Sequence, residues 1–278
     1  GEFTVIKDEV VIGDNVIINT GSIIEHDNII GNSSNIAPGV CLAGGVKIKQ
    51  KTLKEFLKKT VMSGTQSITD AILKFESDGL KINANSQPKQ ARVMAWLKKS
   101  TFKEYEELGN VGMNDIDNVI KVIDRFGEMI TLKKEGNLLT ISGDKKKVDI
   151  ELVAENFLET DSGEPTLEFA ETFALGSNTL GNVFSDVKMN KDSTLTIETK
   201  EKNVVFKNTG KYKFMTEIDA PTCKGGVKSS YGNALIDSVG QLSGALEISM
   251  GNNYPLKVME KTDDSVITMI VAPFVEEE

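Results

Sequence analysis

The chain has 278 residues, of which 39% are hydrophobic and 26% are charged, and its formal net charge is −9. This length and composition indicate a globular protein of two or three domains, and no apolar run approaches the roughly 18–20 residues that a membrane span requires. The negative charge argues against a protein whose whole surface binds nucleic acid, although it permits a small basic face.

The first 48 residues carry an apolar residue at every sixth position. Seven isoleucines and one leucine share this spacing: Ile6, Ile12, Ile18, Ile24, Ile30, Ile36, Leu42 and Ile48. A period of six fits neither a helix nor an ordinary strand, but it is typical of a β-helix of hexapeptide turns, in which one residue per turn points to the axis. We therefore predict a short β-helix over residues 1–46.

After this segment, helical and strand patterns alternate. Helical spacing predicts helices over residues 51–62, 114–126, 175–189 and 229–242. Apolar runs and turn signals predict strands or hairpins over residues 72–82, 91–97, 129–142, 195–206, 212–218, 245–259 and 266–271. The stretch 151–165 is acidic and contains Ser, Gly and Pro, so we interpret it as a connector.

Part of this pattern occurs twice, 116 residues apart. Seven apolar positions of the first copy correspond to apolar positions of the second. They are Val111, Val119, Ile120, Ile123, Phe126, Ile130 and Leu132 in the first copy, and Val227, Leu235, Ile236, Val239, Leu242, Leu246 and Ile248 in the second. Each copy reads as helix, strands, helix, strands. The repeat therefore predicts two similar domains, over residues 47–150 and 166–278, joined by the connector 151–165.

Residues 46–278 resemble the DNA sliding clamps of the proliferating cell nuclear antigen (PCNA) type. The resemblance rests on the connector and on the segments FKEYEELGNVGMNDIDNVIKVI, GVKSSYGNALIDSV, MGNNYPLKV and IVAPFVEEE. It implies an α+β fold in which two-domain subunits close into a homotrimeric ring, with helices lining the hole and sheets forming the rim. Such a ring is a processivity factor and not an enzyme.

The resemblance also implies partners and a location. The ring encircles double-stranded DNA without reading its sequence, tethers DNA polymerase, flap nuclease and ligase, and is placed on DNA by a clamp loader. We expect no membrane partner and no cofactor. The place of action is the cytoplasm at a prokaryotic or viral replication site, or the nucleus of a eukaryote.

By this resemblance, basic side chains on the helices face the hole, because lysine and arginine neutralise phosphates without reading bases. The expected DNA-facing residues are Lys51, Lys54, Lys58, Lys59, Lys121, Arg125, Lys188 and Lys191. The second copy supplies only the last two. Its low charge favours one alternative, a clamp-like scaffold that no longer encircles DNA, and a merely solvated helix face is another.

Partners of these clamps dock into an apolar groove beneath the connector. The resemblance assigns to this groove Leu152, Val153, Phe157, Leu158, Pro255, Ala272, Pro273 and Phe274. Subunits of the family join through edge strands, which correspond here to residues 147–152 and 211–216. The expected interface residues are Lys147, Val148, Ile150, Lys211, Lys213 and Met215.

The segment NTGSIIEHDNIIGNSSNIAPGVCLAGGV resembles hexapeptide-repeat sugar acetyltransferases, whose fold is a left-handed β-helix and whose donor is acetyl-coenzyme A. By that resemblance His26 is a general base for O- or N-acetylation, and an acetyltransferase fragment is the alternative function. The segment makes little over two coils, and Asn35 stands where a second histidine is common. We therefore expect His26 to be a surface turn residue. Two cysteines and one histidine are also too few for a Cys/His zinc site, so we expect no metal.

Overall fold

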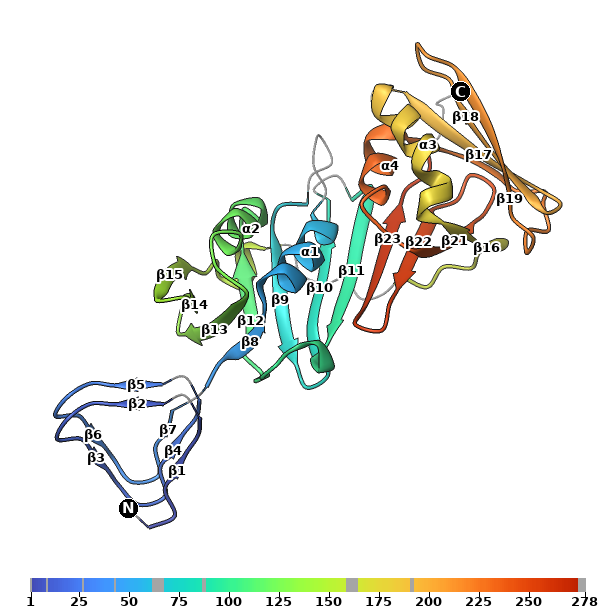
Figure 1. Ribbon diagram of the computed structural model, residues 1–278. Helices are drawn as coiled ribbons and strands as arrows, with labels where there is room; N and C mark the ends of the chain where they lie inside the picture. The colour runs from blue at the N-terminus through green and yellow to red at the C-terminus, as the bar shows by residue number, and fades with distance from the viewer. Residues whose placement is uncertain are drawn as a thin grey trace.

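The computed structural model describes residues 2–8, 10–26, 28–42, 44–61, 68–86, 89–158, 165–190 and 193–274, without the side chains of 234, 235 and 237. The molecule is elongated, and an amino-terminal β-helix projects from one end of an α+β body (Figure 1). In the described part of the chain, every helix is too short or too polar to cross a membrane.

Seven two-residue strands of the described chain form the β-helix: β1 (Val5–Ile6), β2 (Val11–Ile12), β3 (Ile17–Ile18), β4 (Ile23–Ile24), β5 (Ile29–Ile30), β6 (Asn35–Ile36) and β7 (Cys41–Leu42). Strands eighteen residues apart pair in parallel, as Val5 does with Ile23. The pairings β1-β4-β7, β2-β5 and β3-β6 give the three sides that are visible in Figure 1. Three six-residue turns therefore make one coil, which is the arrangement that the period of six predicts.

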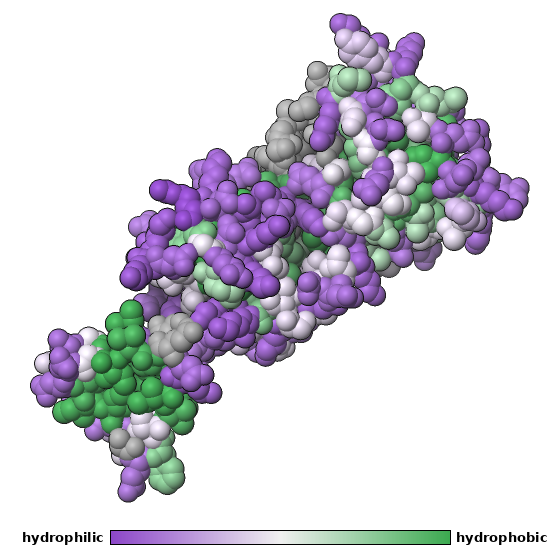
Figure 2. Space-filling view, in the orientation of Figure 1, coloured by the Kyte–Doolittle hydropathy of each residue, from purple (hydrophilic) through white to green (hydrophobic). Residues whose placement is uncertain are grey.

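Burial in the β-helix differs between its coils. Ile24 is 0% exposed because β4 lies between β1 and β7, whereas Ile6 of the first coil is 49% exposed. Ile30 is also buried, although β5 pairs only with β2 among the described strands. Figure 2 shows the apolar surface of the β-helix in green.

The body contains two four-stranded antiparallel sheets. The first has the order β15-β14-β13-β8, with β8 (Val46–Lys49), β13 (Met129–Glu135), β14 (Leu138–Gly143) and β15 (Lys146–Glu151). The second has the order β19-β18-β17-β20, with β17 (Thr194–Lys200), β18 (Asn203–Asn208), β19 (Phe214–Asp219) and β20 (Lys228–Gly232).

An eight-stranded sheet joins the two copies in the order β12-β9-β10-β11-β23-β22-β21-β16. The first copy supplies β9 (Ala71–Glu76), β10 (Gly79–Asn85), β11 (Ala91–Lys98) and β12 (Gly109–Met113). The second supplies β16 (Glu171–Gly176), β21 (Ala245–Met250), β22 (Leu256–Lys261) and β23 (Ser265–Val271). The copies meet where β11 pairs antiparallel with β23, from Ala91 opposite Val271 to Leu97 opposite Ser265.

Four α-helices of the described chain lie on one side of these sheets (Figure 1): α1 (Gln50–Thr60), α2 (Ile116–Ile123), α3 (Ser177–Met189) and α4 (Asn233–Val239). Two 3₁₀ turns, η1 (Lys99–Thr101) and η2 (Glu155–Phe157), lie in connections. The Asp115 side chain caps α2 by accepting the backbone N–H of Asn118. The helices pack in pairs, α1 with α2 and α3 with α4, so their apolar sides are buried and their polar sides form one surface.

Two predicted helices begin too early. Leu175 and Gly176 end β16, so α3 starts at Ser177, and residues 229–232 belong to β20 instead of the helix. Ser229 and Tyr231 lie opposite Ile197 and Leu195 of β17, so their backbone groups are paired in a sheet. Over four residues an apolar pattern fits both periods, and here the neighbouring strand decides the conformation. The pattern also missed β12, whose sequence contains two glycines.

Candidate functional sites

Basic side chains occur on the polar surface of the helices. Lys51, Lys58, Lys121, Arg125 and Lys188 are exposed, Lys54 and Lys59 are half-buried, and Lys191 lies outside the described residues. The helix sequences are unequal. α1 contains four lysines and α2 one, whereas α3 and α4 together contain only Lys188. The surface is therefore more basic in the first copy than in the second.

Carboxylates accompany these cations. Lys54 of α1 pairs with Asp124 at the end of α2, and this pair holds the pKa of Asp124 below its usual range. Lys58 Nζ lies 3.2 Å from Oε1 of Glu55 on the same helix. The exposed Lys58–Glu55 pair is weak and is screened by salt, so Lys58 is able to exchange this carboxylate for another anion.

Lys59 has a different setting. Its Nζ lies 2.5 Å from Oε1 of Glu260 on β22, and the other oxygen of Glu260 accepts the backbone N–H of Ser243 at 2.6 Å. Glu260 is only 1% exposed. We therefore assign Lys59 to the contact between the two copies, in addition to the DNA-facing place that the resemblance gave it.

The first half of the connector lies against β12. The backbone N–H of Val153 donates to the carbonyl oxygen of Gly112 at 3.0 Å, and Leu158 packs on the same glycine. Leu158 is buried and Leu152 is half-buried. Phe157 is 80% exposed and projects from η2. The apolar connector residues therefore divide into a packed set and one exposed ring.

A cavity of about 510 Å³ lies beneath residues 152–156. Its lining includes Lys134, Gly136 and Asn137 as well as Leu152 and Val153. The side chain of Asn110 donates to Oε2 of Glu155 at 2.9 Å across this cavity. Leu152 and Val153 of the predicted groove therefore line this cavity together with polar groups.

The other predicted groove residues lie at the middle of the eight-stranded sheet. Pro255 precedes β22 and Ala272 follows β23, and the two strands pair there with Leu256 opposite Val271. The backbone N–H of Ala272 donates to the carbonyl oxygen of Gln90 at 2.8 Å, and that of Phe274 to Ser230 at 2.7 Å. Four strand spacings, about 19 Å, separate β12 from β23, so the first half of the connector is remote from this place.

Residues 165–169, at the end of the connector and just after it, supply groove candidates that the prediction from the sequence missed. The ring of Phe169 packs edge-on against Tyr254, with centroids 5.7 Å apart. Pro165, Leu167 and Phe169 are half-buried and alternate with exposed residues. This alternation was the available signal, because it is the pattern of an extended segment that covers a sheet. We call Phe169, Tyr254, Pro255, Ala272 and Pro273 the carboxyl-terminal apolar cluster.

The two strands expected at a subunit interface are both sheet edges. β15 pairs only with β14 and β19 only with β18 among the described strands, and they lie at opposite ends of the body (Figure 1). Lys147, Lys211, Lys213 and Met215 are exposed. Val148, Ile150 and Phe214 are half-buried and pack against the core on one side. Each edge thus presents backbone groups and apolar flanks that another strand can cover.

His26 lies in the turn after β4, but the expectation of a surface residue is wrong. Its side chain is 13% exposed, and its Nδ1 lies 2.6 Å from Oε2 of Glu104, a residue of the body. No local pattern indicates this contact, because Glu104 lies far from His26 along the chain. The imidazole therefore sits at the junction of the β-helix and the body.

Solved structures with the same fold are known. A. fulgidus PCNA bound to the C-terminal region of FEN-1 matches with a TM-score of 0.74 and 15% identity, over 85% of this chain and 100% of that one. PCNA from Entamoeba histolytica matches at 0.71 and 18%, over 84% and 99%. The PCNA2–PCNA3 complex from Sulfolobus tokodaii matches at 0.71 and 17%, over 84% and 100%.

No protein-family model and no curated protein matches the sequence. The similarity to PCNA is therefore one of structure at low sequence identity. Over about 85% of its length, this chain has the α+β fold of the PCNA sliding clamps.

Proposed function

We propose that this chain is one subunit of a trimeric ring that encircles duplex DNA and raises the processivity of a DNA polymerase. The observation that carries the proposal is the sliding-clamp fold, in which the four described helices lie on one side and the described strands β15 and β19 are sheet edges at the two ends (Figure 1). In a closed ring the helices line the hole and the sheets form the rim. This function needs mechanical closure and no chemistry from the protein.

The pairing of β11 with β23 inside the chain supports a specific strand pairing between chains. The sheet order β15-β14-β13-β8 of the first copy corresponds to β23-β22-β21-β16 of the second. Likewise β19-β18-β17-β20 corresponds to β11-β10-β9-β12. Inside the chain β11 pairs with β23, and their counterparts β19 and β15 are edges. The same junction therefore forms when β19 of one subunit pairs with β15 of the next.

The repeat also supplies the register of this junction. Leu132 and Ile248 are equivalent by the 116-residue repeat. From Leu132, the pairings β13–β14 and β14–β15 lead to Val148, and from Ile248, the pairings β21–β22 and β22–β23 lead to Met269. Val148 is therefore the counterpart of Met269.

The counterparts on β11 and β19 follow from the hairpins β9–β10 and β17–β18, each of which has a two-residue turn. When the strand pairings are counted from these turns, Phe214 is the counterpart of Val93. Because Val93 lies opposite Met269 inside the chain, Phe214 lies opposite Val148 between subunits. Both side chains are half-buried, so the new pair extends the core across the junction.

Exposed charges complement one another in this register. Three residues on the β19 side face three of opposite charge on the β15 side: Lys211, Lys213 and Glu217 face Glu151, Asp149 and Lys145. Opposite-charge pairs across strands contribute about 0.2–1 kcal/mol each. The two edges therefore attract one another.

Such a junction is head-to-tail, and head-to-tail contacts give a closed ring when their rotations complete a full turn. Each subunit contributes two similar copies, and the junction inside the chain resembles the one between chains. Three subunits then give six nearly equivalent copies around the hole.

The helix surface supports a loose, salt-sensitive contact with DNA. Lys51 and Lys58 are exposed on α1, Lys121 on α2 and Arg125 just after it. Carboxylates accompany Lys58 and its neighbour Lys54, and α4 has no basic residue. Phosphate contacts of this kind carry no sequence information and weaken steeply with salt. We therefore propose that the first copy supplies most of the DNA contact.

Partner docking is proposed at the carboxyl-terminal apolar cluster. A. fulgidus PCNA binds the C-terminal region of FEN-1, which makes a short segment of a flap nuclease a suitable ligand for this chain too. A few apolar anchors supply most of the affinity of such segments. The edge-on ring pair Phe169–Tyr254 beside Pro255 offers such anchors.

Polymerase processivity tests the proposal. Primer extension on singly primed circular DNA, with a polymerase and clamp loader from the same source, is expected to give longer products per binding event when this protein is present. Unchanged product lengths, together with a monomer in solution, would refute the clamp. If the protein binds partners and forms a ring but the products are no longer than without it, the result would favour the alternative of a clamp-like scaffold that no longer encircles DNA.

A further inference from the structure

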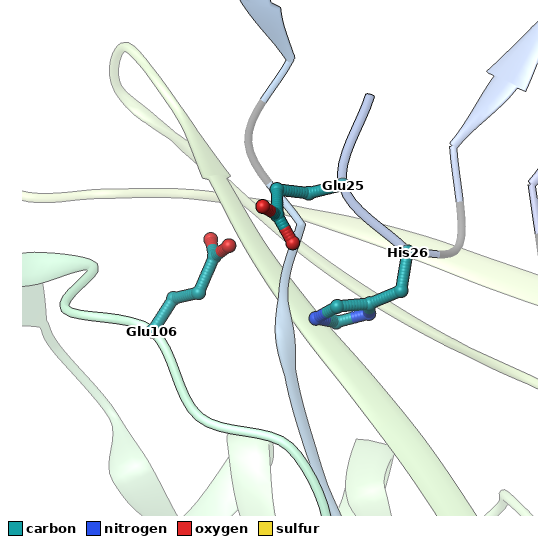
Figure 3. Close-up of side chains that lie close together, drawn as sticks. All are labelled: Glu25, His26 and Glu106. Atoms are coloured by element: carbon teal, nitrogen blue, oxygen red, sulfur yellow. The ribbon is translucent and has the colours of Figure 1, made fainter. Parts of the chain in front are cut away.

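Acidic and imidazole side chains from two parts of the chain meet where the β-helix joins the body. Glu25 and His26 follow β4, whereas Glu104 and Glu106 lie between η1 and β12. Figure 3 shows Glu25 and His26 of one segment close to Glu106 of another. One ligand atom from each of these three lies within 4.8 Å of the other two.

Glu104 lies beside the imidazole. Oε2 of Glu104 lies 2.6 Å from Nδ1 of His26 and is buried without a hydrogen-bond partner among the described residues, so a small rotation of the ring lets Nδ1–H donate there and leaves the Nε2 lone pair for a metal. A carboxylate that accepts the second N–H is the usual neighbour of a histidine that binds a metal, because it fixes the tautomer and raises the basicity of the ring.

Gly44 leaves room beside this nitrogen. A Cβ atom on residue 44 would lie 2.6 Å from Nε2 of His26 and 3.0 Å from Oε1 of Glu106. The backbone N–H of Gly44 donates to the same Oε1 at 3.1 Å. The glycine therefore keeps open the space between the imidazole and the Glu106 carboxylate.

The charges of the cluster favour a dication. Glu25 and Glu106 are half-buried, and their carboxylate oxygens lie within 4.8 Å of one another. Like charges at this separation repel one another, and partial burial strengthens the repulsion because water screens it less. A bound divalent cation removes this repulsion.

We propose that Glu25, His26 and Glu106 bind one Zn²⁺ ion, with Glu104 supporting the histidine. Imidazole nitrogen suits zinc better than it suits magnesium or calcium, and water completes a tetrahedral set. Bonds of about 2.0–2.2 Å place tetrahedral ligand atoms about 3.3 Å apart. Side chains with atoms within 4.8 Å reach this spacing by small rotations.

The ion would tie the β-helix to the body, because its ligands come from both. The expectation of no metal counted only cysteine and histidine as ligands. In the proposed site, carboxylates supply the ligands that cysteine and histidine do not. Since Glu104 and Glu106 lie far from His26 along the chain, only the fold brings this set together.

Metal titration of the full chain tests the site. Cys41 is exposed, so all measurements use a Cys41→Ser background to remove a competing thiol. After dialysis against a chelator, Zn²⁺ is titrated in competition with a metal-indicator dye, and one ion per chain is expected to bind. His26→Gln and Glu106→Gln each are expected to raise the Kd by more than about 100-fold, and Glu104→Gln by about 10–100-fold.

Glu107→Gln is the matched control, because this neighbouring carboxylate is exposed and lies outside the cluster. Its Kd is expected to stay within about twofold of the parent, well below the 10–100-fold changes of supporting residues. Co²⁺ in place of Zn²⁺ gives a visible spectrum that reports tetrahedral nitrogen and oxygen ligands, and circular dichroism checks that each variant is folded. Absence of saturable binding, or folded His26→Gln and Glu106→Gln proteins that bind like the parent, would overturn the proposal.

Discussion

Nζ of Lys59 lies 2.5 Å from Oε1 of Glu260, and this pair joins α1 of the first copy to β22 of the second. The second oxygen of Glu260 accepts the backbone N–H of Ser243, so the buried carboxylate is satisfied from both sides. The two copies are thus joined on the helix side as well as through the β11–β23 pairing.

Removing this carboxylate is expected to weaken the junction. Glu260→Ala leaves Lys59 and the Ser243 N–H without their acceptor, so we predict a loss of about 2–4 kcal/mol in the free energy of unfolding, measured by urea denaturation. Glu55→Ala removes an exposed partner of Lys58 and serves as the control, with an expected change below about 1 kcal/mol. Equal effects of the two substitutions would show that Glu260 has no special role.

DNA contact is expected to depend on the first copy. The double variant Lys121→Glu, Arg125→Glu reverses two exposed charges, whereas Lys188→Glu reverses one on α3. We predict that the double variant lowers retention on circular duplex DNA at least tenfold and reduces the salt slope by roughly one per lost contact, measured at several salt concentrations. A larger loss with Lys188→Glu would place the contact in the second copy.

Docking is expected to require the carboxyl-terminal apolar cluster. Phe169→Ala removes one ring of the Phe169–Tyr254 pair, so we predict at least a tenfold rise in Kd for a labelled peptide from the C-terminal region of a FEN-1 nuclease, measured by fluorescence anisotropy. Phe157→Ala removes an exposed ring of η2, in the first half of the connector, and is the control, with little change expected. If Phe157→Ala caused the larger loss, the peptide would bind at the first half of the connector.

Local patterns in the sequence were sufficient for much of the fold. The period of six anticipated the strands of the β-helix, and alternation anticipated β11, β21 and β23 nearly to the residue. These signals depend on residues close along the chain. The predicted start of α4 was wrong because residues 229–232 pair with β17, and no local pattern in the sequence indicates this contact.

The candidate sites depended more strongly on distant contacts. The sequence placed Lys59 on a basic helix surface, but its partner Glu260 lies 201 residues away along the chain. It grouped Leu152 and Val153 with Pro255, although β12 and β23 are four strand spacings apart. It identified β15 and β19 as edges only through the family resemblance, because an edge is defined by the whole sheet.

The register at the subunit junction gives a cross-linking prediction. Next to the Phe214–Val148 pair, Met215 of one subunit lies opposite Lys147 of the next, on the exposed side. Lys147→Cys with Met215→Cys, in a Cys41→Ser background, is expected to form disulfides between subunits, because directly opposite Cβ atoms lie within about 4.5–5.5 Å. Denaturing electrophoresis is expected to show dimers and trimers after mild oxidation.

The control pairs Met215→Cys with Glu151→Cys, which is displaced by four residues, or about 13 Å, along the strand. Cross-linking is expected to be poor there. Efficient cross-linking of the displaced pair instead of the matched pair would show that the junction has another register.

The most direct test of a ring around DNA is topological. The Lys147→Cys, Met215→Cys protein is loaded on nicked circular duplex by a clamp loader, oxidised, and denatured in detergent before electrophoresis. We predict that covalent trimers stay with the circle in detergent and are released once a restriction enzyme cuts it. Trimers that never stay with the circle, or that stay equally with linear DNA, would contradict the proposal that this chain encircles DNA.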